Sequence, residues 1–113
     1  MHELSIADNI INAVKEASQS RGMLTVSKIG VRVGSLSSVD PDALTFGFDV
    51  LKRDQGMMDC ELAIEFVKTS ARCNRCAREF EVEDFVFVCT QCGSAQCDLV
   101  SGQELEIAYF EGE

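Results

Sequence analysis

The chain has 113 residues, of which 46% are hydrophobic and 26% are charged, and its formal net charge is −9. This length fits one compact unit with, at most, a small additional lobe. The acidic balance argues against nucleic acid as a partner and favours cations or basic partners. No stretch approaches the roughly 20 apolar residues of a membrane span, and the first residues do not resemble a signal peptide. We therefore expect a cytoplasmic protein that does not enter a membrane.

The first predicted element is a helix over residues 5–20. Apolar residues recur there at helical spacing: Leu4, Ala7, Ile11 and Val14. Ser5 followed by Asp8 resembles a capping box, so Ser5 is the predicted N-cap. This prediction leaves Met1, His2 and Glu3 just outside the helix.

A strand and a second helix are predicted next. Residues 25–34 are β-branched and alternate, which favours extended structure. Asp40 is a predicted N-cap, and Pro41 suits the first helical position. The second helix should end before Gly56. Its predicted buried face consists of Leu44, Phe48 and Leu51.

Two further segments predict half-buried strands because apolar and charged residues alternate in them. The apolar face of residues 57–68 consists of Met58, Cys60, Leu62, Ile64 and Phe66. Near the end of the chain, Leu105, Ile107 and Tyr109 alternate with Glu104 and Glu106. We expect Cys60 to be a core residue of its strand.

Residues 71–100, between these two strands, hold five of the six cysteines. Two Cys-x-x-Cys pairs are separated by twelve residues and offer four candidate ligands: Cys73, Cys76, Cys89 and Cys92. Two such pairs joined by a hairpin can bring four sulfur atoms to one tetrahedral zinc ion. The intervening residues predict two strands, with Phe80, Phe85 and Phe87 covering the metal. The segment is therefore predicted to be an inserted zinc lobe.

Other chemistry is open to these cysteines. They can form two disulfides or a dithiol redox pair, although a redox Cys-x-x-Cys normally begins a helix in a βαβ unit. Iron can replace zinc in a four-thiolate site. Cys97 is either a bystander or a substitute ligand. A closed shell of four sulfurs leaves no position for catalysis.

His2 is the only histidine of the chain. The Met1 amine, the amide nitrogen that follows it and the His2 imidazole can chelate one ion through fused rings. Such square-planar nitrogen coordination suits Ni²⁺ or Cu²⁺. Three donors leave a fourth position for Glu3 or another acid. The alternative is that His2 is a solvated residue near the chain end.

Three features together resemble the HypA/HybF family of nickel metallochaperones for hydrogenase maturation. They are "MHELSIA" at the start, "DPDAL" after the first strand, and the Cys-x-x-Cys spacing. The resemblance implies an α+β fold in which two helices lie on a three-stranded sheet with an inserted zinc-ribbon lobe. We accordingly expect a nickel-binding domain over residues 1–70 plus 101–113 and a zinc-binding domain over residues 71–100.

The resemblance also implies site residues. The nickel set is Met1, His2, Glu3 and Asp40, and the zinc set is Cys73, Cys76, Cys89 and Cys92. Asp40 alternatively serves only as a helix cap. Some family members carry a histidine beside the cysteines, where this chain has Ala77 and Gly93.

The implied function is to bind Ni(II) as cargo, with Zn(II) as a structural ion, and to deliver the nickel for maturation of NiFe-hydrogenase. The implied partners are a nickel-binding GTPase of the HypB type and the hydrogenase large subunit precursor. The alternative is a zinc-ribbon module that binds protein or nucleic acid and has no nickel function. An enzyme is disfavoured because the sequence offers no nucleophile–base pair. The oligomeric state, a homodimer included, stays open.

Overall fold

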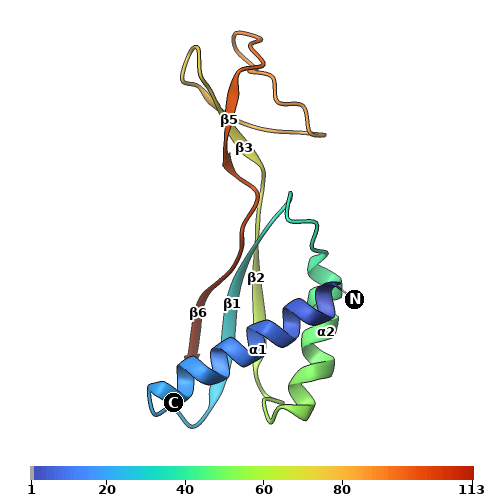
Figure 1. The fold of residues 1–113 in the computed structure, drawn as a ribbon, viewed down its shortest axis with the longest axis vertical. Helices are drawn as coiled ribbons and strands as arrows, with labels where there is room; N and C mark the ends of the chain where they lie inside the picture. Colours follow the sequence, from blue (N-terminus) through green and yellow to red (C-terminus); the bar gives the residue numbers. More distant parts are fainter. Residues whose placement is uncertain (1) are drawn as a thin grey trace.

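The computed structural model describes residues 2–113, with the side chains of residues 3–113. In chain order the elements are α1 (His2–Ser20), β1 (Val26–Gly34), α2 (Pro41–Asp54), β2 (Glu61–Val67), β3 (Ser70–Cys73), β4 (Glu79–Glu81), β5 (Cys97–Ser101) and β6 (Leu105–Gly112). The molecule is elongated, with extents of 54 × 28 × 16 Å, and its two sheets follow one another along the long axis (Figure 1). The predicted α+β class is confirmed.

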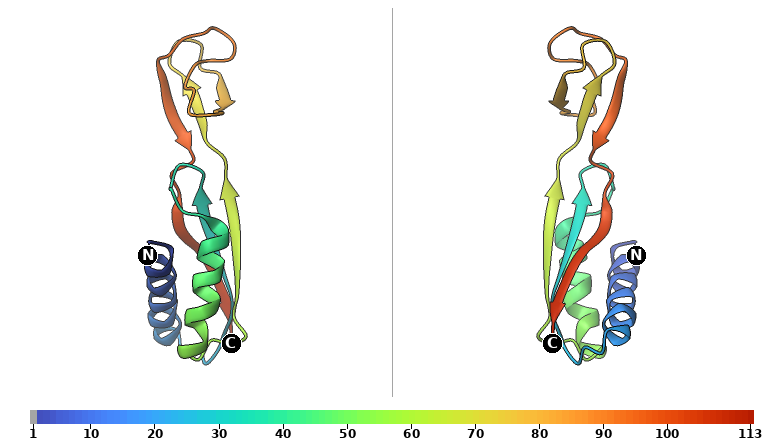
Figure 2. Two further views of the ribbon diagram at one scale, coloured as in Figure 1. Left: turned by 90° about the vertical axis from the view of Figure 1, so that its right-hand side faces the viewer. Right: turned by 90° about the vertical axis from the view of Figure 1, so that its left-hand side faces the viewer.

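The first sheet has the strand order β2-β1-β6. β2 runs parallel to β1, and β6 runs antiparallel to it. Both helices lie on one face of this sheet (Figure 2). Because the last strand pairs with the first, the chain between β2 and β6 leaves this sheet and returns to it, as the sequence predicted.

The main core lies between β1 and the two helices. Ile29, Val31 and Val33 of β1 are fully buried, and their alternation with smaller or polar residues is the pattern that predicted the strand. Leu44 and Phe48 of α2 face them and are also buried. Cys60, just before β2, belongs to the same core, as predicted.

The opposite face of this sheet is polar. Charged side chains form two rows across the three strands: Glu61, Lys28 and Glu111, then Glu65, Arg32 and Glu106. The Arg32 guanidinium lies 3.5 Å from the Glu65 carboxylate and 3.6 Å from that of Glu106. Between the rows, the Tyr109 ring lies directly over Gly30 and leaves no room for a Cβ there. This face can therefore be exposed to water without cost to the core.

The second sheet, with the strand order β4-β3-β5, is joined to the first by two chain passages. These passages are the connections between β2 and β3 and between β5 and β6, and the turn after β1 is hydrogen-bonded to the chain at both. The Ser35 N–H donates to the Val67 carbonyl at 2.9 Å, and the Leu36 N–H donates to the Gly102 carbonyl at 2.7 Å. The Ser35 and Thr69 hydroxyls are also hydrogen-bonded. These bonds fix how the second sheet continues from the first.

The predicted start of the first helix is wrong. α1 begins at His2, so His2 and Glu3 lie within the helix, and Ser5 is an interior residue rather than the N-cap. Tertiary contacts explain the extra turn. Leu4 packs against Gly47 of α2, and the Glu3 carboxylate accepts a hydrogen bond from the backbone of the α2 N-cap residue.

The predicted apolar faces of β2 and β6 are partly wrong. Met58 and Phe66 are exposed, because Met58 precedes β2 and Phe66 lies near its end. In β6, Leu105 and Ile107 face the helices. A bulge lies between Ile107, which pairs with Val31, and Tyr109, which pairs with Gly30, and it turns Tyr109 to the open face. A one-residue irregularity reverses the side on which every later residue lies.

The lobe contains one short strand between its cysteine pairs, where two were predicted. β4 covers only Glu79–Glu81. Asp84 and Phe85 then adopt φ angles of 51° and 62°, which interrupt extended structure. Phe80 is buried and Phe87 packs beside it, but Phe85 is 74% exposed and does not cover the cysteines.

Candidate metal centres

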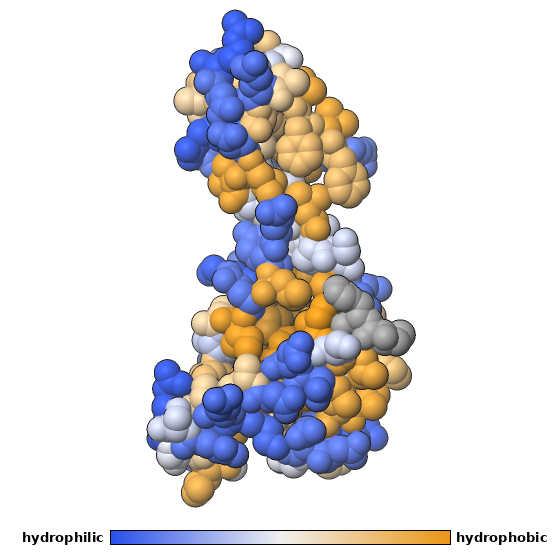
Figure 3. All heavy atoms as spheres, viewed as in Figure 1, coloured by the Kyte–Doolittle hydropathy of each residue, from blue (hydrophilic) through white to orange (hydrophobic). Residues whose placement is uncertain are grey.

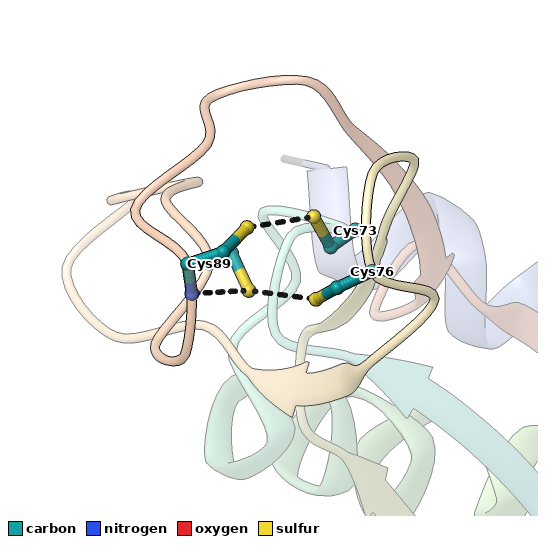
Figure 4. A group of neighbouring side chains, drawn as sticks. Cys73, Cys76 and Cys89 are labelled. Carbon is teal, nitrogen blue, oxygen red and sulfur yellow. Dashed lines mark hydrogen bonds between the residues drawn. The ribbon is translucent and has the colours of Figure 1, made fainter.

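The four cysteines of the two pairs converge at the far end of the second sheet. The Sγ atoms of Cys73, Cys76, Cys89 and Cys92 all lie within 4.8 Å of one another. Two of these separations, Cys73–Cys92 and Cys76–Cys89, are 3.5 Å. Figure 4 shows the sulfur atoms from the two pairs facing each other across the loop. A tetrahedral zinc ion with Zn–S bonds of about 2.3 Å requires sulfur separations of about 3.8 Å, so this arrangement fits a single zinc ion.

The two cysteine pairs are built as the same turn, used twice. The Cys73 N–H bonds to the Arg78 carbonyl at 2.9 Å, and the Cys89 N–H bonds to the Ser94 carbonyl at 2.8 Å. The residue after each second cysteine, Ala77 or Gly93, donates back to the first cysteine's carbonyl at 2.9 and 3.0 Å. Both of those residues are left-handed, with φ angles of 64° and 75°. Cys-x-x-Cys spacing thus produces a turn that directs both sulfurs to one side.

Backbone amides point at the first sulfur of each pair. The Arg75 N–H lies 3.4 Å from the Cys73 Sγ. The N–H groups of Gln91 and Cys92 each lie 3.4 Å from the Cys89 Sγ. Hydrogen bonds from the amides, that of Cys92 foremost, lower the pKa of Cys89 to about 6, despite the opposing effect of burial. The pKa of Cys73 is lowered for the same reason, with the Cys76 amide as the largest cause.

The second cysteine of each pair behaves differently. The Arg78 amide lowers the pKa of Cys76, but the Cys89 thiol, burial and the other two thiols outweigh it and raise this pKa to about 11. The pKa of Cys92 is also raised, since the Cys73 thiol and burial outweigh the Ser94 amide. Without a metal, the cluster therefore contains two acidic and two weakly acidic thiols. Binding a divalent ion requires thiolates and releases the remaining protons.

The other two cysteines lie outside the four-sulfur cluster. Cys97 begins β5 opposite Cys73 in the ladder, and its thiol lies 3.6 Å from the Ser94 carbonyl. Burial is the largest cause of its raised pKa. Cys60 is buried in the main core, and burial likewise raises its pKa.

The predicted nickel residues are only partly within the described region. Met1 and the side chain of His2 lie outside it, whereas Glu3 and Asp40 are brought together. The Asp40 N–H donates to the Glu3 Oε2 at 3.3 Å. Asp40 is also the N-cap of α2, because its Oδ1 accepts from the Asp42 N–H at 3.0 Å. The helices start at the same end of the first sheet (Figure 2), which the sequence pattern did not indicate.

Sequence reasoning named the four sulfurs but did not identify which individual amides lower the pKa values of Cys73 and Cys89. The amides of Arg75 and Gln91 act through the backbone, so their side-chain identity gives no signal. The usable signal is the two-residue gap itself, since this gap places the following amides beside the first sulfur.

Neither helix in the described part of the chain is long and apolar enough to cross a membrane.

Comparison with known proteins agrees with this architecture. Residues 1–112 match the family model described as "Hydrogenase/urease nickel incorporation, metallochaperone, hypA". The chain is 35% identical over 113 residues to the hydrogenase maturation factor HypA of Acidithiobacillus ferrooxidans, covering 100% of both chains. It is 40% identical over 114 residues to HypA of a Roseiflexus species, covering 100% of this chain and 93% of the relative.

A solved structure shows the same fold. The structure titled "Solution structure of HypA protein" superposes with a TM-score of 0.73 at 22% identity, covering 100% of this chain and 97% of that one. The family consists of maturation factors that act as metallochaperones, not of enzymes. With a family match over nearly its whole length, the chain belongs to the HypA family of hydrogenase and urease nickel-incorporation metallochaperones.

Proposed function

We propose that this chain binds Ni(II) at its amino terminus and delivers it for maturation of NiFe-hydrogenase. The proposed donors are the Met1 amine, the His2 amide nitrogen and the His2 imidazole, with Glu3 and Asp40 beside them. The observation that carries the proposal is the start of α1 at His2. The first N–H groups of a helix have no acceptor within the helix. Nickel can therefore replace the His2 amide proton without breaking a helical hydrogen bond.

The electrostatics of this position support exchange rather than permanent capture. α1 and α2 both begin at this end of the first sheet, and the positive ends of two helix dipoles disfavour a cation. The carboxylates of Glu3 and Asp40 offset that field. A site with opposing contributions of this kind suits a cargo ion that must be passed on.

Glu3 and Asp40 already have structural partners, which limits their part in the site. One Glu3 oxygen accepts from the Asp40 amide, and one Asp40 oxygen caps α2. We propose that the second oxygen of each carboxylate is the one offered to the ion. We propose Glu3 as the nearer of the two to nickel, because it follows His2 directly in the helix.

We further propose a structural Zn(II) at Cys73, Cys76, Cys89 and Cys92. The sulfur separations and the amide hydrogen bonds support this assignment. On this basis residues 71–100 form the zinc domain, and residues 1–70 with 101–113 form the nickel domain. The proposed partners are a nickel-binding GTPase of the HypB type and the hydrogenase large subunit precursor, in the cytoplasm, where thiols remain reduced.

The test is calorimetric titration of tag-free, zinc-loaded protein with Ni²⁺. His2→Ala should abolish specific binding, because the chain has no other imidazole, while zinc content and circular dichroism stay unchanged. Acetylation of the Met1 amine should also weaken binding. Binding should weaken as the pH falls below about 6.5, because imidazole then holds a proton. Unchanged affinity in His2→Ala would move the nickel site elsewhere.

Two carboxylate variants separate ligation from capping. Asp40→Asn keeps a good N-cap, so the free energy of unfolding should change little. Glu3→Gln keeps an acceptor for the Asp40 amide. A fall in nickel affinity in either variant assigns its carboxylate to the site, and unaltered affinity leaves that residue a structural role only. A chain that binds zinc and no nickel in any form would instead be a zinc-ribbon interaction module.

A further inference from the structure

A groove of about 320 Å³ runs between α1 and β6 on the helical side of the first sheet. Ile6, Ile10 and Ala13 of α1 form one wall, and Leu105 and Ile107 of β6 form the other. Leu105 is 43% exposed and Ile107 is 37% exposed, although both point to the side of the sheet that forms the core. Hydrophobic side chains gather on this face of the molecule (Figure 3).

The β6 wall of the groove is also a free sheet edge. β6 pairs only with β1 among the described strands. Gly34 donates to the Glu104 carbonyl at 2.7 Å, so these two residues form a hydrogen-bonded pair. Along an antiparallel ladder, hydrogen-bonded pairs alternate with pairs that are not hydrogen-bonded to each other. Leu105 and Ile107 therefore direct their N–H and C=O groups away from β1, towards the free edge.

These two residues consequently offer two kinds of contact at once. A strand added along β6 would bond to the backbone of Leu105 and Ile107. Its side chains opposite them would enter the apolar groove beside α1, because paired residues lie on the same face of a sheet. The residue between would lie opposite Glu106 on the polar face. Glu106 already ends a row of alternating charge there, after Glu65 and Arg32, so a Lys or Arg fits that position.

A second copy of this chain fits the edge poorly. The antiparallel register that sets Leu105 against Ile107 of another copy sets Glu106 against Glu106. Like charges directly opposite destabilise a strand pair. Glu104, Glu111 and Glu113 add further negative charge to the same segment. Pairing of two copies along β6 is therefore disfavoured by charge, whereas pairing of β6 with a basic strand is not.

We propose that the α1–β6 groove binds an extended segment of a partner protein in which apolar and basic residues alternate, and that this segment adds a strand to the free edge of β6. The inference does not depend on nickel binding. It uses the form of recognition in which backbone bonds give affinity and alternate side chains give specificity.

The probes are three short capped peptides that alternate valine with lysine, valine with glutamate, or serine with lysine. They are titrated into full-length, zinc-loaded protein and followed by backbone amide NMR. The valine–lysine peptide should shift the amides of residues 6–13 and 105–107 and should protect the Leu105 and Ile107 amides from hydrogen exchange. The other two peptides should bind at least about tenfold more weakly.

A matched pair of variants tests the groove. Ala13→Glu puts a charge in the wall, and Asn12→Glu puts the same charge on an exposed neighbour that does not line the groove. Only the first should weaken valine–lysine binding, by about tenfold or more. Glu106→Gln should reduce the preference for lysine over glutamate.

Several outcomes would overturn the proposal. They are binding at the β2 edge, binding without protection of the Leu105 and Ile107 amides, no binding of the valine–lysine peptide, and equal loss in both helix variants. Sedimentation showing a dimer that protects the β6 edge would assign the edge to a second copy instead.

Discussion

The two sheets of this chain are stabilised in different ways. The first sheet packs against two helices, and its core contains large aliphatic and aromatic side chains such as Phe48, Ile11 and Ile29. The buried cluster of the second sheet consists of Ala71, Cys73, Phe80 and Cys89. Half of that cluster is therefore made of residues proposed to bind zinc.

The difference shows what each region needs in order to fold. Burial of apolar area stabilises the first sheet at any metal concentration. The second sheet is too small to bury enough apolar surface by itself. We expect the proposed zinc ion and the backbone bonds at its junction with the first sheet to stabilise it. With the proposed zinc site, the same chain would combine a region folded by apolar burial with one whose folding depends on an ion.

The largest expected effect is that of removing the metal. A strong chelator should unfold β3, β4 and β5 and leave the first sheet folded, because structural zinc sites contribute on the order of 10 kcal/mol to folding. Hydrogen exchange measured separately over the two sheets checks this. Cys73→Ser should have the same effect, and Cys97→Ser should not, since Cys97 is outside the cluster. Equal loss of protection in both sheets would show that they do not fold separately.

A change in the main core should destabilise the first sheet and leave the metal site of the second sheet intact. Phe48 is fully buried, so Phe48→Ala should lower the free energy of unfolding of the first sheet by about 3–5 kcal/mol. Urea denaturation followed by circular dichroism measures this, with zinc content expected to remain at the wild-type value. Phe46→Ala is the matched control on the same helix. Phe46 is 71% exposed, and its removal should change stability by no more than about 0.5 kcal/mol.

Because removing the metal is expected to unfold the lobe, its thiols in metal-free protein should titrate near their ordinary pKa, and two separated steps are the signature of a lobe that remains folded. The pKa of Cys89 is lowered to about 6 and that of Cys76 is raised to about 11. In a folded lobe at pH 7, the thiolate form of Cys89 should therefore outnumber the thiol form about tenfold. Because the folded pKa of Cys89 lies below its ordinary value, its contribution to stability is complete above that value and is lost as the pH falls through about 6.

Ultraviolet absorbance of the thiolate, recorded against pH in reduced, metal-free protein, measures these steps. If a low-pH step is present, Cys89→Ser should diminish it, whereas Cys60→Ala should leave it intact, because burial raises the pKa of Cys60. A low-pH step that Cys89→Ser removes would contradict complete unfolding of the lobe without metal.

The smallest expected effect sharpens the comparison between the two cysteine turns. Ala77 and Gly93 occupy equivalent left-handed positions, which cost a residue with a Cβ about 1–2 kcal/mol. Ala77→Gly should therefore stabilise the zinc-loaded lobe by about 0.5–1 kcal/mol, after the entropic cost of glycine. Gly93→Ala should destabilise it by about 1 kcal/mol, although a Cβ there meets no other atom. Thermal unfolding of the lobe measures both changes, and effects of the same sign would contradict the equivalence of the turns.

Local patterns in the sequence predicted much of this structure. The β1 alternation, the Asp40–Pro41 start of α2, and the buried Cys60 all appear as expected. Each depends on interactions within a few residues or on a strict period, which is information that a sequence carries directly. The cysteine spacing likewise predicted a four-sulfur cluster, because the turn that it forms is local.

The wrong predictions share a different cause. The helix begins at His2 instead of Ser5 because Leu4 and Glu3 contact α2, which is distant in sequence. Tyr109 lies on the open face because of one bulge against β1. Phe85 is exposed because β4 ends at Glu81 and because Asp84 and Phe85 itself are left-handed, which interrupts extended structure. None of these features has a signature in the local periodicity.

By itself, then, the sequence determined the order of the two helices and of the strands of the first sheet, the face that each helix buries and the sulfurs that meet, because short-range backbone geometry and burial period decide them. Only the tertiary structure decided where α1 starts, that Glu3 meets Asp40, and that the backbone edge of Leu105 and Ile107 coincides with an apolar groove. Those relations join residues far apart in the chain, and they exist only once β6 has returned to pair with β1 and the two helices have packed side by side.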